Sequence, residues 1–331
     1  MTDTSEKPAR QAAPTTRSGF AAILGAPNAG KSTLTNRLVG EKVSIVTHKV
    51  QTTRFQIRAI AMLEASDGGR SQVVLVDTPG IFEPRKQDRL SKSMVHAAWS
   101  GADESGAVVH VVDSGAWHRH KTGEGTAQDR LASEDTERVM AGLARRGRKA
   151  ALVLNKIDTI PTDELLPLIA HFNSAGDYDR IFVISATSGD GVADLATYLA
   201  DAMPVGPLLY PEDQAADMPM RLMAAEITRE KLFLRLHDEL PYASMVETEN
   251  WEDRKDGSVK IDQVIYVRRG TQKGIVLGKG GSTVKDIGAA ARREMQDWLG
   301  RKVHLFLFVK VRENWQDDRA RYAGTGLEFD I

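Results

Sequence analysis

The chain has 331 residues, of which 41% are hydrophobic and 27% charged, and its formal net charge is −1. This length and composition predict two domains of ordinary soluble character. The absence of cysteine excludes disulfides and thiolate metal sites. No apolar run is long enough for a transmembrane helix. Residues 1–18 are polar and contain proline, which predicts a disordered tail rather than a secretory signal.

Apolar runs alternate with helix-like stretches through the first part of the chain. Strands are expected at 20–24, 55–62, 72–76, 107–112, 150–154 and 181–184, and a helix at 31–39. Residues 63–70 resemble a hairpin turn, and the polar segment 118–134 is expected to be a surface loop or insertion. This alternation predicts an α/β domain over 19–203, with a mostly parallel sheet covered by helices on both faces.

The composition changes at residues 204–219, where prolines and acidic residues cluster. This segment is predicted to be a linker. Beyond it, the sequence predicts a smaller α+β domain over 220–331. Its expected elements are a helix at 220–239, strands at 243–251 and 259–268, a Gly-rich turn, a helix at 282–299 and a strand at 303–311.

The segment after the first strand reads Gly-x-x-x-x-Gly-Lys-Ser and leads into a helix, which is the context of a phosphate-binding P-loop. Its backbone N–H groups and the helix N-terminus favour phosphate. Lys31 is predicted to bridge the β- and γ-phosphates and Ser32 to bind Mg²⁺. A simple Gly-rich turn is the alternative. The predicted nucleotide contacts here are Gly25, Ala26, Pro27, Asn28, Ala29, Gly30, Lys31, Ser32 and Thr33.

Two further segments are predicted to lie near the γ-phosphate. The sequence Asp-Thr-Pro-Gly directly follows a strand, so Asp77 can hold Mg²⁺ through water and the Gly80 N–H can meet the γ-phosphate. Thr53 can bind Mg²⁺ only while the γ-phosphate is present, which would make residues 47–54 a switch. The predicted nucleotide contacts are Asp77, Thr78, Pro79 and Gly80. The predicted catalytic residues are Lys31, Thr53 and Gly80, and the predicted metal ligands are Ser32, Thr53 and Asp77.

The sequence Asn-Lys-Ile-Asp at 155–158 predicts guanine recognition. The Asp158 carboxylate can accept hydrogen bonds from N1–H and the N2 amine of guanine, whereas adenine offers no matching donors. Asn155 is expected to support the base and the loop, and the Lys156 stem to cover the base. A backbone N–H at Ser185 or Ala186 could meet guanine O6. Each motif follows a strand, and ligands of open parallel sheets bind at those carboxyl ends.

A Gly-rich turn near the C-terminus predicts RNA binding. Residues 278–281 read Gly-Lys-Gly-Gly and lead into a helix, as in the G-x-x-G loop of a KH domain. Residues 268–312 hold eleven Lys or Arg against three Asp or Glu, an excess that attracts phosphate. A solvated basic face is the alternative, and residues 275–277 could be core or groove. The predicted RNA contacts are Ile275, Gly278, Lys279, Gly280, Gly281 and Lys285.

With these motifs in this order, the chain resembles the Era family of bacterial GTPases. The resemblance covers about residues 19–326 and rests on GAPNAGKST, QTTR, DTPGI, NKID, SATSG, ITREKLFLRLHDELP, IVLGKGGSTVKDIG and VHLFLFVKVRENW. It implies a P-loop GTPase domain followed by a type II KH domain, with GTP and GDP as ligands and Mg²⁺ as cofactor. It also implies binding to the 3′ end of small-subunit (16S) rRNA and a role in small ribosomal subunit assembly. The implied location is cytoplasmic, with peripheral contact at the inner membrane as a further expectation.

Three questions remain open at this level. Ile81 stands where many other GTPases carry a glutamine that orients water, so hydrolysis is expected to be slow and open to stimulation. A binding protein with negligible turnover is therefore one alternative, and a GTPase acting on large-subunit rRNA is another. Asn28 could help to hold K⁺ beside the phosphates or could only shape the loop. Nothing indicates an oligomer, so a monomer is expected.

Overall fold

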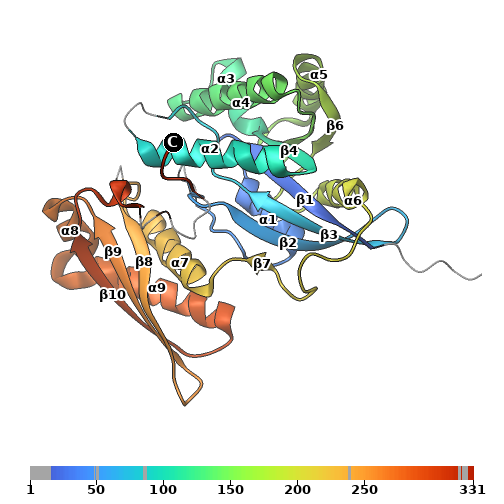
Figure 1. Ribbon diagram of the computed structural model, residues 1–331. Helices are drawn as coiled ribbons and strands as arrows, with labels where there is room; N and C mark the ends of the chain where they lie inside the picture. The colour runs from blue at the N-terminus through green and yellow to red at the C-terminus, as the bar shows by residue number, and fades with distance from the viewer. Residues whose placement is uncertain are drawn as a thin grey trace, which may run out of the picture.

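The computed structural model describes residues 16–47, 49, 52–84, 88–237, 240–319, 322 and 327–331. The predicted tail lies outside these residues up to residue 15. Residues 16–18 belong to the first strand, because Gly206 N–H donates to the Thr16 carbonyl (3.1 Å) and Ser18 N–H to the Pro204 carbonyl (3.0 Å). Figure 1 shows two sheets, one in the blue-to-yellow part of the chain and one in the orange-to-red part.

Within the described residues, seven strands form the first sheet, in the order β6-β5-β4-β1-β3-β2-β7. Their bounds are β1 (Thr16–Gly25), β2 (Ile57–Glu64), β3 (Arg70–Asp77), β4 (Ala107–Asp113), β5 (Ala150–Asn155), β6 (Tyr178–Val183) and β7 (Ala216–Asp217). β2 runs antiparallel to both β3 and β7, and the remaining pairs are parallel. The predicted mostly parallel sheet is confirmed.

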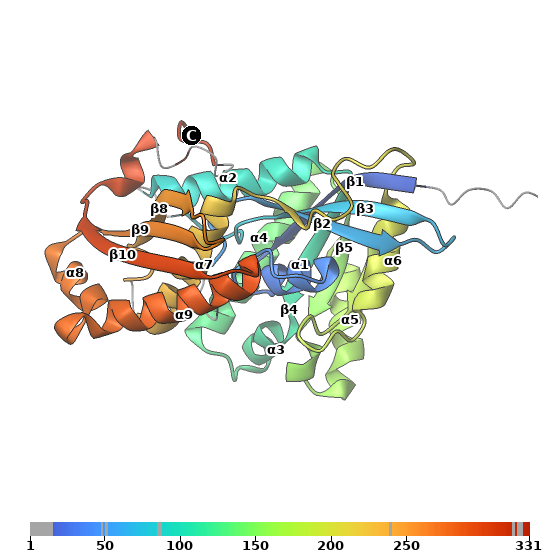
Figure 2. The same cartoon turned by 90° about the horizontal axis from the view of Figure 1, so that it is seen from below.

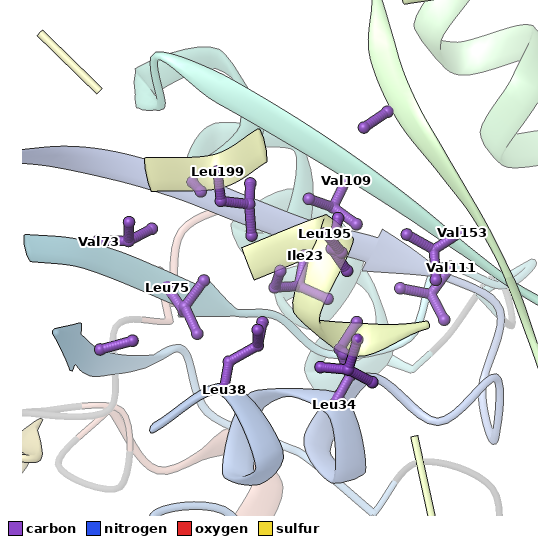
Figure 3. Close-up of a cluster of buried hydrophobic side chains, with 14 of the residues drawn as sticks. Ile23, Leu34, Leu38, Val73, Leu75, Val109, Val111, Val153, Leu195 and Leu199 are labelled. Atoms are coloured by element: carbon purple, nitrogen blue, oxygen red, sulfur yellow. The ribbon is translucent and has the colours of Figure 1, made fainter. Parts of the chain in front are cut away.

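Helices cover both faces of this sheet, as the continuous burial of its central strands requires. Ala21 and Ile23 of β1 pack with α1 (Lys31–Val39) and α6 (Val192–Ala202), as Figure 3 shows for Ile23. Ala22 and Leu24 point to the opposite face. That face is covered by α2 (Arg89–Glu104), α3 (Ser114–Thr122), α4 (Ala127–Arg146) and α5 (Leu165–Ala175). We call β1 to α6 the N-terminal unit.

The prediction of a surface loop or insertion at 118–134 is wrong, because α3 and α4 cover these residues with only a short turn between them. The Asp113 side chain caps α3 by accepting from Ala116 N–H (2.9 Å). Thr126 and Asp129 form a capping box at the start of α4. α3 buries Trp117, but the rest of its sequence is too polar to show an apolar period. Caps, rather than hydrophobic periodicity, define these helices.

The predicted linker at 204–219 runs back along the edge of the first sheet. Leu209 and Tyr210 N–H groups both donate to the Gln72 side chain (2.8 and 2.9 Å). β7 then adds to β2, pairing Ala216 with Ala59. The segment is therefore held against the N-terminal unit along much of its length (Figure 1).

The C-terminal unit follows, from α7 to η4. Its elements are α7 (Met220–Arg235), β8 (Met245–Asp253), β9 (Val259–Val267), α8 (Gly270–Leu277), η3 (Lys279–Gly281), α9 (Ser282–Leu299), β10 (Val303–Val311) and η4 (Trp315–Asp317). The predicted helix at 220–239 ends four residues early, and 238–239 lie outside the described residues. The Gly-rich stretch expected as a turn contains α8. Gln272 caps this helix by accepting from Arg268 and Arg269 N–H groups (2.9 and 3.1 Å).

The C-terminal sheet has the order β10-β9-β8, with β9 parallel to β10 and antiparallel to β8. α7, α8 and α9 cover one face. Part of the other face, at Met245 and Tyr266, packs with Leu90 and Met94 of α2. The C-terminus returns to α2 as well (Figures 1 and 2), where Ser93 donates to the Glu328 carbonyl (2.6 Å). No helix in the described part of the chain is both long and apolar enough to cross a membrane.

Candidate functional site

The loop between β1 and α1 has the backbone that a phosphate cradle requires. Gly30 has a φ of 97°, and a Cβ there would lie 2.1 Å from Asn155 Nδ2. A Cβ on Gly25 would lie 2.3 Å from the Val111 carbonyl. Lys31 Nζ donates to the Gly25 and Ala26 carbonyls (3.0 and 2.8 Å), and burial lowers its pKa to about 8. The loop thus holds a buried ammonium group against its own backbone, where phosphates would favour the charged form.

Three predicted metal ligands meet beside this loop. Ser32 Oγ lies 2.8 Å from Thr53 Oγ1 and 2.9 Å from Asp77 Oδ2. Burial raises the pKa of Asp77, while the Ser44 and Ser32 hydroxyls and Lys31 act in the opposite direction. Among the described residues, Asp77 Oδ1 has no hydrogen-bond partner. Clustered hydroxyl oxygens and a buried, incompletely paired carboxylate fit a Mg²⁺ ion, which prefers oxygen ligands.

The structure separates the two adjacent threonines. Thr53 is buried beside Ser32, whereas the Thr52 hydroxyl bonds to Thr47 and to the Lys49 carbonyl (2.6 and 2.7 Å). Ser44, which sequence reasoning missed, donates to Asp77 Oδ2 (2.8 Å). No motif marks Ser44, because its contact is formed only when residues after α1 fold back to the end of β3.

The residues after β3 close against the phosphate loop. A Cβ on Gly80 would lie 2.8 Å from Pro27 N, so the backbones of the two loops touch. Thr78 Oγ1 donates to the Ile23 carbonyl (2.7 Å), and Ile81 N–H donates to the Gly25 carbonyl (3.1 Å). The Ile81 side chain is 2% exposed and belongs to the core between the sheet and α2. This aliphatic side chain points into the core and has no polar group that could contact an attacking water.

Asn155 connects the phosphate loop to the predicted base-binding loops. Its side-chain amide donates to the Ala29 carbonyl (2.8 Å) and accepts from Ala186 N–H (2.9 Å). Lys156 adopts a left-handed φ of 63°, and its Nζ bonds to Asp113 (2.5 Å). The Asn-Lys-x-Asp motif is thereby fixed at the carboxyl ends of β4 and β5.

The Asp158 carboxylate and the backbone N–H groups of Ser185 and Ala186 differ in whether they are available to bind a base. Asp158 is exposed in η1 (Ile157–Thr159), and among the described residues nothing pairs with its carboxylate. The Ser185 N–H donates to the Asp190 carbonyl (3.0 Å), and the Ala186 N–H is engaged by Asn155. Both N–H groups predicted for guanine O6 are thus used within the loop in this structure. Their contact with a base stays a prediction.

The predicted RNA loop is open on its outer side. Gly280 and Gly281 have φ values of 60° and 79°, and a Cβ on either would meet nothing within 4 Å. Lys279 and Lys285 are exposed. The structure also answers the question about residues 275–277, since Ile275 is 59% exposed and Val276 is fully buried. Ile275 therefore belongs to the surface beside the loop and Val276 to the core.

The two units meet at residues that sequence reasoning did not select. Arg229 of α7, itself 2% exposed on its side chain, donates to the Thr52 carbonyl. Glu230 of α7 accepts from Val46 N–H and from Lys42 Nζ (both 2.9 Å). These contacts hold α7 against residues 42–47, 49 and 52–54, which we call the contact segment. The contact segment includes Thr53 at the metal-ligand cluster.

Arg54 anchors the end of the contact segment in the C-terminal unit. Its guanidinium donates to the carbonyls of Pro241 (3.2 Å), Tyr242 (2.9 Å) and Ser244 (2.7 Å), which we call the carbonyl cage. It also lies over the Phe233 ring (5.6 Å) and the Trp315 ring (5.8 Å). Burial, and the nearby charge of Arg229, lower the pKa of Arg54 to about 9. Its cage partners lie far along the chain, so no local pattern marks them.

Comparisons with known proteins agree with both units. A family described as "50S ribosome-binding GTPase" matches residues 20–156, and one described as "KH domain" matches residues 239–316. GTPase Era of Maricaulis maris is 56% identical over 315 residues, which cover 95% of this chain and 98% of that protein. GTPase Era of Caulobacter vibrioides is 54% identical over 331 residues, covering 100% of both.

Two solved structures share the whole arrangement. A single-residue variant of Aquifex aeolicus Era bound to GDP·AlF4⁻ matches with a TM-score of 0.82 and 33% identity, covering 94% of this chain and 99% of that one. A structure of Era with MgGDPNP and nucleotides 1506–1542 of 16S ribosomal RNA matches with the same values. The likeness therefore extends over both units.

Proposed function

This chain belongs to the Era family of GTPases, and we propose that it is a switch in which the bound nucleotide controls RNA binding by the C-terminal unit. The observation that carries this proposal is the contact segment. At Thr53 it touches the metal-ligand cluster, and at Arg54 it enters the carbonyl cage. A γ-phosphate that holds Thr53 would also hold Arg54 in the cage, and its loss would release both.

We propose that hydrolysis is an in-line attack of water on the γ-phosphate of GTP. Lys31 and the N–H groups of the phosphate loop would stabilise the developing negative charge, and the Gly80 N–H would meet the γ-phosphate. Ser32, Thr53 and Asp77 would hold Mg²⁺, which neutralises charge on the phosphate oxygens. Ile81 is aliphatic and its side chain is buried, so it offers no polar group to orient the water, and slow turnover open to stimulation follows. Asn28 is the residue we propose for a K⁺ ion beside the phosphates.

We propose that the RNA is the 3′ end region of small-subunit rRNA. The Era structure with nucleotides 1506–1542 of 16S rRNA supports this choice, and so does the open glycine loop with exposed Lys279 and Lys285. The proposed role is assembly of the small ribosomal subunit. We further propose that the protein acts as a monomer in the cytoplasm, with peripheral contact at the inner membrane.

A large-subunit role is the second candidate, because the family that matches residues 20–156 is described as a 50S ribosome-binding GTPase. Multiple-turnover phosphate release with isolated small or large subunits separates the two. We expect small subunits to raise the rate and large subunits to leave it near the intrinsic value. Stimulation by large subunits alone would overturn the small-subunit proposal, and no turnover with either would favour a binding protein without catalysis.

A further inference from the structure

The Asp77 carboxylate is oriented by two serine hydroxyls that donate to the same oxygen. Ser32 Oγ donates to Asp77 Oδ2 (2.9 Å), and Ser44 Oγ donates to the same atom (2.8 Å). Asp77 is fully buried, and its Oδ1 has no hydrogen-bond partner among the described residues. Because two donors hold Oδ2, the carboxylate cannot rotate freely, and Oδ1 remains as the oxygen that can accept from a metal-bound water.

The two serines differ in what else their hydroxyls have to do. Ser32 is a predicted metal ligand, and its hydroxyl also lies 2.8 Å from Thr53 Oγ1. Ser44 is a predicted ligand of neither metal nor nucleotide, and in the described part of the chain its hydroxyl bonds to Asp77 alone. With a metal ion in the site, Ser32 must bind the ion and orient Asp77 together, whereas Ser44 only orients Asp77.

The backbone at Ser44 is held in place by its own unit. Asn36 Oδ1 of α1 accepts from the Val43 and Ser44 N–H groups (both 2.9 Å), and Asn36 Nδ2 donates to the Ser44 carbonyl (2.8 Å). The flanking side chains of Val43 and Ile45 are both buried. The Ser44 hydroxyl is therefore directed at Asp77 by a fixed backbone, as a group that orients a metal ligand has to be.

The groups that hold Ser44 are separate from those that the γ-phosphate is proposed to control. Asn36 lies on α1, and Val43 packs in the core between α1 and the sheet. The proposed switch releases Thr53 and Arg54, at the other end of the contact segment, when the γ-phosphate is lost. Ser44 should therefore keep its hydrogen bond to Asp77 with GDP as well as with GTP, whereas Thr53 contributes only with GTP.

We propose that Ser44 is a positioning residue for the Mg²⁺ ion in both nucleotide states, acting through Asp77. The proposal rests on the Mg²⁺ site proposed above and adds to it a residue that touches neither the ion nor the nucleotide. Removing a group that orients a metal ligand commonly weakens metal binding about 10–100-fold. Ser44 thus contributes to Mg²⁺ affinity before and after hydrolysis, which distinguishes it from Thr53.

The test measures how Mg²⁺ slows the dissociation of fluorescent GDP, or of a fluorescent non-hydrolysable GTP analogue, from the full chain. The midpoint Mg²⁺ concentration of this effect reports the affinity of the metal site. We expect Ser44→Ala to raise the midpoint about tenfold with both nucleotides, and Ser44→Thr, which keeps the hydroxyl, to stay within about threefold of the unmodified chain. Thr53→Ala should raise the midpoint only with the GTP analogue.

Two further variants show whether the effect belongs to the site. Ser71→Ala is the matched control, because Ser71 is also fully buried and its hydroxyl donates one hydrogen bond, to the Ala200 carbonyl (2.8 Å). It should leave the midpoint unchanged. Asn36→Ala removes the three hydrogen bonds that hold residues 43 and 44 and should raise the midpoint with both nucleotides. Thermal unfolding shows whether each variant is folded, and Asn36→Ala keeps the proposal testable if Ser44→Thr is not.

Three outcomes would overturn the proposal. An unchanged midpoint in Ser44→Ala would leave the hydrogen bond to Asp77 as a contact of the fold alone. A rise confined to the GTP analogue would mean that Ser44 acts with the switch, and a folded Ser44→Thr that behaves like the alanine variant would mean that the hydroxyl is not responsible. If Mg²⁺ does not slow dissociation from the unmodified chain, the proposed Mg²⁺ site fails first and the role of Ser44 fails with it.

Discussion

Asp158→Asn is expected to weaken GTP binding by about a hundredfold and to create affinity for xanthosine triphosphate. The Asp158 carboxylate is exposed in η1 and pairs with nothing among the described residues, so it is available to accept from guanine N1–H and the N2 amine. Two hydrogen bonds to a charged group together contribute several kcal/mol, about 1.5–3 kcal/mol each. An asparagine amide can still accept a hydrogen bond from N1–H, but its NH₂ group faces the N2 amine of guanine. Two donors then face each other without an acceptor.

Xanthine restores the match, because it carries a carbonyl where guanine carries the N2 amine. Displacement of a fluorescent nucleotide measures both affinities. Asp163→Asn, at another exposed acid in η2 (Thr162–Glu164), is the matched control and should change neither affinity. Retention of full GTP affinity by Asp158→Asn would remove this residue from the base site, and with it the assignment of guanine specificity to the loop at 155–158.

Arg54→Ala is expected to uncouple RNA binding from the nucleotide state. Coupling between two sites commonly changes affinity about 5–150-fold, and we expect RNA affinity of the unmodified chain to differ between the GTP-analogue and GDP forms within that range. Every hydrogen bond of Arg54 in the described residues ends on a carbonyl of the cage. Without the guanidinium, the contact segment loses its connection to the carbonyl cage and keeps only its contacts with α7. We expect the ratio to fall to about twofold or less, because the cage is the connection that adjoins Thr53 directly.

The controls for Arg54 separate coupling from simple damage. Arg58→Ala removes an exposed arginine four residues later, which lies over Phe20 within the N-terminal unit, and should keep the ratio. Arg54→Gln keeps hydrogen-bond donors but removes the charge. It replaces the alanine variant in the binding assay if thermal unfolding shows that Arg54→Ala is not folded. GTP affinity should stay within about threefold in both Arg54 variants, since the guanidinium touches no predicted nucleotide contact. A preserved ratio in these variants would show that the cage transmits nothing.

Three elements beside the motifs were predictable from the sequence to the residue, whereas β3 and β5 extend one or two residues beyond their predicted bounds. The predicted helices at 31–39 and 282–299 and the predicted strand at 303–311 coincide with α1, α9 and β10. Each helix is bounded by glycines at both ends, and Gly40 and Gly300 have left-handed φ values of 85° and 62°. At these elements, the flanking glycines and the spacing of apolar residues indicate the same bounds. The sequence alone was therefore enough to predict where they begin and end.

Other elements depended on contacts that the sequence does not display. α8 contains Gly270 and Gly274, which suggested a turn, yet the Gln272 side chain caps it. α3 is polar on most of its surface and is held by Asp113 at its start. The strand β1 begins before the predicted residue 20 because residues of the returning linker bond to it. In each case a side chain or a distant segment, rather than propensity, decided the structure.

The residues of the candidate site also fall into two groups, those that the local sequence identifies and those that depend on distant contacts. The motif residues could be named because their spacing and their places after strands are local properties. Ser44 reaches Asp77 across 33 positions, and Arg54 reaches the carbonyl cage across 187 to 190 positions. The first contact requires the N-terminal unit to be folded, and the second requires the two units to be docked. A switch at residues 47–54 and the two binding functions were expected from the sequence, whereas the residues proposed to link nucleotide and RNA emerged from the structure.

One measurement tests the switch most directly, namely RNA binding by the unmodified chain loaded with a non-hydrolysable GTP analogue or with GDP. The probe is a short RNA from the 3′ end of small-subunit rRNA, with a scrambled RNA of equal length as control. The contact segment predicts tight, sequence-dependent binding in the GTP-analogue form and binding weaker by at least about fivefold in the GDP form. Equal binding in both forms, or to both RNAs, would contradict the switch and leave the C-terminal unit as a generic RNA tether.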